Sequence, residues 1–147
     1  MKQILKWPLI IAGAVVILRV IVERMGAPSA VSNILSVAVL HTVLGPLYFA
    51  TRVAKSKAQH PFRMLFTLIG IYAVCTRAMI LPTYWLARIF DWHESRFAGL
   101  AGPDVSPFIG FIVIPFATAA FWIAASLVVG GVIGAITLAL VRRLIKR

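Results

Sequence analysis

The sequence has very little cysteine and few acidic residues. Cys75 is its one cysteine, so a disulfide within the chain and a cysteine metal site are both excluded. Only 4 of 147 residues are acidic, and residues 107–141 contain no charged side chain. An uncharged run of 35 residues is typical of membrane-spanning sequence and exceeds what the core of a small soluble domain needs.

Motifs for catalysis and for metal binding are also missing. The sequence contains no glycine-rich phosphate loop, no serine elbow, no HExxH motif and no paired carboxylates within an apolar run. Asp91, His93, Glu94 and Asp104 are metal-ligand residue types, but their spacing matches no known metal site, and they predict a solvated loop. We therefore expect no metal and no cofactor.

Hydrophobic residues make up 61% of the chain, and the mean hydropathy is +0.97. Soluble domains contain about 45–50% apolar residues. The apolar runs predict one all-α domain over 1–147, an integral membrane four-helix bundle with helices at about 5–24, 29–51, 63–90 and 116–141. Pro115 should interrupt the long uncharged run, so we expect a short interfacial or broken helix at about 107–114.

The basic residues predict the orientation in the membrane. With the N-terminus inside, 10 of the 15 Lys and Arg residues fall at cytoplasmic ends, 3 fall outside, and Arg19 and Arg77 lie within helices. Both termini are therefore expected in the cytoplasm. The membrane is expected to be the plasma membrane, which is the inner membrane of a cell that has two. This orientation explains the net charge of +11 without a nucleic acid, and it places Arg142 and Arg143 near anionic lipids of the cytoplasmic face.

Polar residues from several helices fall at nearly one depth. Counted from the cytoplasmic ends at 1.5 Å per residue, Arg19 is about 20 Å deep, His41 about 17 Å and Arg77 about 21 Å. Arginine at this depth normally faces a protein interior or a wet cavity, and its fork suits phosphate and carboxylate groups. Glu23 follows Arg19 by one helical turn, Tyr48 shares the face of His41, and Tyr84 shares the face of Arg77. The candidate ligand-binding residues are thus Arg19, Glu23, His41, Arg77, Tyr48 and Tyr84.

Two interpretations of these residues remain open at this point. Arg19 and Glu23 can form a purely structural ion pair, or they can leave positive charge for a ligand. His41 can be a hydrogen-bonded interior side chain or a proton carrier.

One stripe of the fourth helix consists of small or polar residues and a tryptophan: Thr118, Trp122, Ser126, Gly130, Gly134 and Thr137. Ser126, Gly130 and Gly134 follow the small-xxx-small pattern, which predicts close helix packing. The partner helix can belong to the same chain or to another subunit.

The function expected from these features is non-enzymatic binding, or transport, of an anionic or amphipathic small ligand at the intramembrane Arg/His layer. Transport would require a homo-oligomer, because four helices are few for a pathway. The alternative is an accessory subunit of a larger membrane complex. A second alternative is a membrane enzyme acting on a lipid-linked or quinone-like substrate, with His41 as acid or base.

Overall fold

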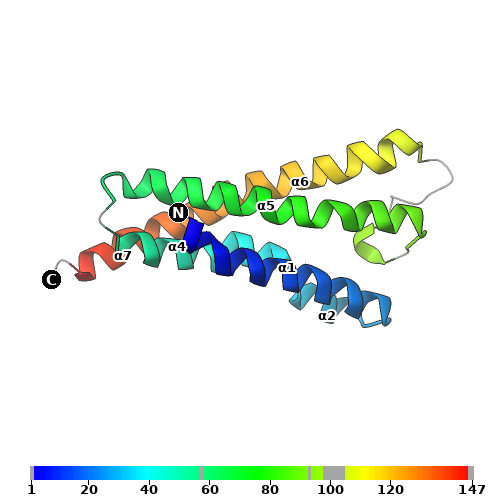
Figure 1. The fold of residues 1–147 in the computed structure, drawn as a ribbon, viewed down its shortest axis with the longest axis horizontal. Coiled ribbons are helices and arrows are strands. Elements are labelled where there is room, and N and C mark those ends of the chain that lie inside the picture. The colour runs from blue at the N-terminus through cyan, green and yellow to red at the C-terminus, as the bar shows by residue number, and fades with distance from the viewer. Residues whose placement is uncertain (1, 57, 93, 98–104, 146–147) are drawn as a thin grey trace.

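The computed structural model describes residues 2–56, 58–92, 94–97 and 105–145, and these form long helices without any strand (Figure 1). Four helical stretches are long and apolar enough to cross a membrane, which confirms the all-helical prediction: Lys2–Arg24, Ala30–Ala54, Pro61–Ile89 and Ile109–Ile145. The first and third stretches are α1 (Lys2–Arg24) and α5 (Pro61–Ile89). The other elements, in chain order, are α2 (Ser29–Ile34), α3 (Val37–Val39), η1 (Leu40–Leu44), α4 (Gly45–Ala54), η2 (Ser95–Phe97), η3 (Ile109–Val113), α6 (Ile114–Ala125), η4 (Ser126–Gly130) and α7 (Gly131–Ile145).

One end of the molecule carries most of the Lys and Arg residues and is called the basic end, and the opposite end is called the loop end. At the basic end, drawn to the left in Figure 1, α1 begins, α4 ends, α5 begins and α7 ends. At the loop end, α1 turns into α2, and α5 is followed by the segment that leads to η3.

The densest packing lies in the half of the molecule toward the basic end. There α4 packs against both α5 and α7, and α1 packs against α5. Phe49, Leu65, Leu68, Tyr72 and Leu138 are almost completely buried in this core. Since lipid tails are as apolar as these side chains, van der Waals packing holds such helices together in a membrane.

Glycine allows the fourth span to approach the second. A Cβ added to Gly130 would lie 2.8 Å from Cγ of Pro46 and 3.2 Å from the carbonyl oxygen of Thr42. A Cβ on Gly134 would lie 3.2 Å from a methyl carbon of Leu65. Two of the three residues of the small-xxx-small pattern therefore face the second and third spans of the same chain.

The fourth span does not break at Pro115, contrary to the sequence-based expectation. Helical turns continue through residues 107–145, so residues 107–114 extend the helix and form no separate segment. Proline has no N–H with which to bond the carbonyl four residues earlier, which belongs to Phe111. Trp85 Nε1 donates a hydrogen bond of 2.9 Å to that oxygen, and the π-helical turn η3 precedes the proline. A neighbouring helix thus satisfies the freed carbonyl.

The second span contains an interruption that the sequence analysis did not predict. Leu35 and Ser36 leave the helical conformation between α2 and α3. Ser36 Oγ accepts a hydrogen bond of 3.2 Å from the N–H of Ala38, and so caps the continuous helical run at 37–54. In a membrane, backbone of this kind is tolerated where it is buried in protein or lines a polar cavity.

Candidate functional site

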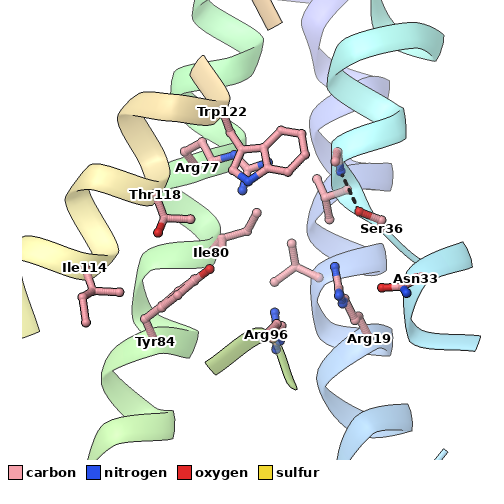
Figure 2. Close-up of a pocket in the computed structure, with 13 residues that line it drawn as sticks. Arg19, Asn33, Ser36, Arg77, Ile80, Tyr84, Arg96, Ile114, Thr118 and Trp122 are labelled. Carbon is pink, nitrogen blue, oxygen red and sulfur yellow. Dashed lines mark hydrogen bonds between the residues drawn. The ribbon is translucent and has the colours of Figure 1, made fainter. Parts of the chain in front are cut away.

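A cavity of about 390 Å³ lies in the half of the molecule toward the loop end. Its walls come from α1, the interrupted second span, α5, η2 and α6 (Figure 2). Val16, Val37 and Ile80 supply apolar surface beside the polar side chains. The polar lining includes Arg19, Asn33, Ser36, Arg77, Tyr84, Arg96 and Thr118. Pockets that hold whole small molecules have volumes of about 300–1,000 Å³.

Arg77 is the deepest charged group of the cavity. Its residue is 7% exposed, and its guanidinium carbon lies 5.1 Å from the ring centroid of Trp122, a cation–π distance. Nη2 hydrogen-bonds to His41 Nε2. Nε is buried and has no hydrogen-bond partner among the described residues. A buried donor without a partner carries a free-energy cost of about 1–3 kcal/mol, and that cost is higher for a charged group.

His41 supports Arg77 from behind the cavity. Arginine only donates hydrogen bonds, so Nε2 of His41 must accept, and the ring is in the neutral tautomer with its proton on Nδ1. Nδ1 then donates to Ser126 Oγ, which itself donates to the carbonyl of Trp122 at 2.7 Å. His41 is fully buried and both of its ring nitrogens are engaged. His41 is therefore placed to position Arg77, and its ring does not reach the cavity surface, where a substrate could exchange a proton with it.

Two further arginines share one carboxylate at the loop side of the cavity. Arg19 Nε lies 2.9 Å from Glu23 Oε1, and Arg96 Nε lies 2.8 Å from Glu23 Oε2. Arg96 Nη2 is buried without a hydrogen-bond partner among the described residues. Burial lowers the pKa of Arg96 from its ordinary value, an effect that Glu23 opposes and Arg19 increases.

The charges of the cavity do not balance. Among the described residues, Arg19, Arg77 and Arg96 contribute three positive charges and Glu23 contributes one negative charge, which leaves a net charge of +2. Glu94 is nearby but forms a 3.0 Å ion pair with Arg24, so that pair adds no net charge. Buried charges in membrane proteins are normally paired, and this excess is the property that an anionic ligand would neutralise.

A second hollow of about 360 Å³ adjoins the cavity toward the loop end. The two share Arg19, Asn33 and Arg96 as lining residues, and Glu23, Ser32 and Glu94 line the second hollow alone. Polar surface thus continues from the cavity to the turn between α1 and α2, where Ala27 lies.

The structure places the sequence-predicted residues in four groups. Arg19, Arg77 and Tyr84 line the cavity, as do Thr118 and Trp122 of the predicted stripe. Glu23 and His41 do not line it but bind arginines that do. Tyr48 lies in the other half of the bundle, where its ring packs against Phe49 and its neighbour Arg52 lies over it at 5.9 Å. Ser126 holds His41, and Gly130 and Gly134 pack against the second and third spans.

Arg96 is the cavity residue that sequence reasoning missed. It is one of the three basic residues that the orientation places outside, and no periodicity in the sequence marks it as a cavity residue. The structure folds η2 back under the cavity, where Phe97 packs among Ala87, Tyr84 and Trp92. Only this tertiary packing brings the adjacent arginine to Glu23.

Within the described residues, no group of three His, Cys, Asp or Glu side chains could hold a metal ion. Comparison with protein families, with curated proteins and with solved structures finds no match to this chain.

Proposed function

We propose that this chain is a plasma-membrane protein that binds an anionic small ligand in the cavity and does not convert it chemically. The observation that carries the proposal is Arg77, which is buried at the cavity with an unpartnered Nε in a site of net charge +2. A guanidinium can donate two parallel hydrogen bonds to a carboxylate or a phosphate.

The basic residues favour an orientation with both termini in the cytoplasm, which directs the loop end outward. The ligand would then reach the cavity from the outer side of the membrane. Binding is better supported than conduction through a single chain, since the apolar core around Phe49, Leu65 and Leu138 fills the half toward the basic end.

The test compares the wild-type protein with Arg77→Gln by native mass spectrometry after gentle extraction from the native membrane. We expect the wild type to retain a small anionic molecule and the variant to lose it. Glutamine removes one unbalanced buried charge but leaves Nε2 of His41 without its donor, so the thermal midpoint of the ligand-free variant should stay close to that of the wild type. A loss of binding without a loss of stability distinguishes a binding role from a structural one.

The matched control is Arg63→Gln, which removes an exposed arginine from the same helix near its basic end. It should keep the bound molecule. The proposal is wrong if the wild type carries no such molecule, or if Arg77→Gln retains it as well as the control does.

A further inference from the structure

The cavity interrupts the seam between the second and fourth spans. Toward the basic end this seam is closed, because Gly130 touches Pro46 and α4 packs along α7. Toward the loop end, α6 packs on α5 and α2 packs on α1, and Figure 1 shows α6 and α2 diverging there. Ala38 from the second span and Thr118 from the fourth both line the cavity. Figure 2 shows Thr118 on the side of the cavity opposite Ser36 of the second span.

The helices on both sides of this open seam carry no charge. Residues 107–141 include all of α6, and residues 29–51 contain His41 as their only ionisable group apart from Tyr48. Exposed side chains on these segments include Ile34, Val39, Phe116 and Phe121. Surfaces of this composition face lipid chains in a membrane protein, so a group that left the cavity between α3 and α6 would meet the hydrocarbon region.

The arginines form a series that leads inward from the loop end. Arg19 lies five residues before the end of α1, about 8 Å along the helix axis. Arg77 lies twelve residues before the end of α5, about 18 Å along that axis. Polar head groups that enter this series from the outer leaflet therefore move from the interface toward the middle of the membrane, with arginine within reach at each level.

The charge of the site favours one head-group chemistry. A phosphomonoester carries about −1.5 to −2 charges at pH 7, which matches the net +2 of Arg19, Arg77, Arg96 and Glu23. A phosphodiester carries only one negative charge and would leave the site positive. The cavity volume of about 390 Å³ also exceeds what a bare ion needs and suits a head group with adjoining atoms of a tail.

We infer that the ligand is a lipid with a terminal phosphate head, which enters through the seam between Ala38 and Thr118. This inference depends on the proposed function and specifies its ligand class. The head binds Arg77 and the two arginines that share Glu23. The hydrocarbon tail leaves between α3 and α6 and remains in the bilayer.

The experiment uses the full chain in phosphatidylcholine nanodiscs that contain a minor fraction of phosphatidic acid or of phosphatidylglycerol with identical acyl chains. Native mass spectrometry counts the lipid molecules that the ejected protein retains. We expect phosphatidic acid to be retained at least about tenfold better than phosphatidylglycerol, equivalent to about 1.4 kcal/mol. Arg77→Gln should abolish that preference, Arg77→Lys should reduce it because the fork is lost, and Arg63→Gln should keep it.

A probe without a hydrocarbon tail tests the anion site and the lipid inference separately. Glycerol 3-phosphate, added to nanodiscs of phosphatidylcholine alone, should bind at least about tenfold more weakly than phosphatidic acid. If it binds equally well in an Arg77-dependent manner, the proposed anion site stands and the lipid inference is wrong. Equal retention of phosphatidylglycerol also overturns the inferred head-group class. If Arg77→Gln and Arg77→Lys both retain phosphatidic acid as the wild type does, the inference and the proposed function fail together.

Filling the seam provides an independent variant. Ala38→Phe adds a large side chain to one wall of the opening and leaves every arginine in place. The retention of phosphatidic acid should fall by more than the binding of glycerol 3-phosphate does. An unchanged ratio between the two probes would show that the tail does not pass between α3 and α6.

Discussion

At the scale of single residues, the contacts around Arg77 explain the role of His41 within an apolar helix. His41 hydrogen-bonds to Arg77 through one ring nitrogen and to Ser126 through the other, and the Ser126 hydroxyl donates a hydrogen bond to the Trp122 carbonyl. The histidine therefore fixes the direction of the guanidinium through Nη2, while Nε of Arg77 stays buried without a hydrogen-bond partner among the described residues.

Replacing His41 by alanine tests this positioning role. The variant leaves a buried arginine nitrogen without its acceptor, so the free energy of unfolding should fall by about 3 kcal/mol. Binding of the anionic ligand should weaken by about tenfold, because the guanidinium loses its orientation. Thermal unfolding in detergent and native mass spectrometry measure the two effects.

The conservative variant His41→Gln supplies an amide oxygen that can accept from Arg77, and it should recover part of both losses. His60→Ala removes an exposed histidine at the start of α5 and serves as the control. If His41→Ala and His60→Ala behave alike in both measurements, His41 does not position Arg77.

Glu23 and Glu94 are two carboxylates whose ion pairs differ in burial. Glu23 is buried between Arg19 and Arg96, so Glu23→Gln should lower the free energy of unfolding by about 3–5 kcal/mol. The partner of Glu94 is Arg24, whose side chain is 51% exposed, so Glu94→Gln should cost at most about 1 kcal/mol. Chemical denaturation of both variants measures the difference.

Ligand affinity should respond to Glu23→Gln in the opposite direction from stability. The cavity charge rises by one unit when the carboxylate becomes an amide, so the folded variant should bind the anion more tightly than the wild type does. A variant that is destabilised and also binds less would indicate that Glu23 contacts the ligand or shapes the cavity directly.

At the scale of helices, proline and glycine decide where the bundle is closed. The π-helical turn η1 directly precedes Gly45 and Pro46, and η4 ends at Gly130. These two turns lie against each other, with Pro46 in the space that a Gly130 side chain would need. The contact ends the open seam on the side of the basic core.

Gly130→Ala should therefore destabilise the bundle by about 1–3 kcal/mol, since the obstructing atoms are a proline ring and backbone oxygens that cannot rotate away. Gly13→Ala in α1 is the matched substitution, where the nearest atom would be Sδ of Met79 at an ordinary 3.7 Å. It should be neutral or stabilising by up to about 1 kcal/mol, because alanine favours the helix. Thermal midpoints of the two variants in one detergent provide the measurement, and equal midpoints would contradict the tight contact.

The sequence predicts cavity residues correctly where they recur at helical spacing on one face of a span. Depth and face placed Arg19, Arg77 and Tyr84 on one prospective site, and the structure gathers these three around one cavity. Proline was misleading at position 115, because Trp85 comes from another span and supplies the bond that a lone helix lacks. Arg96 and the interruption at Ser36 depend on tertiary contacts, which no local pattern encodes.

At the scale of the whole molecule, function depends on which side of the membrane the loop end faces. Two engineered cysteines in a Cys75→Ala background can report this: Met25→Cys, at a position that is 80% exposed in the turn after α1, and Gln59→Cys, in the basic loop before α5. The excess of Lys and Arg at the basic end predicts that a membrane-impermeant maleimide labels residue 25 on intact cells. Residue 59 should be labelled only after the cells are permeabilised.

The orientation also determines the source of the ligand. With the loop end outside, the arginine series begins at the outer leaflet, and the phosphate head of a lipid would descend from that leaflet toward Arg77. If residue 59 is labelled first, the same cavity opens to the cytoplasmic leaflet. Anion binding would survive that result, because the +2 charge and the unpartnered Nε of Arg77 do not depend on orientation. The outward orientation would be wrong, and the phosphate-bearing lipid would then have to come from the inner leaflet.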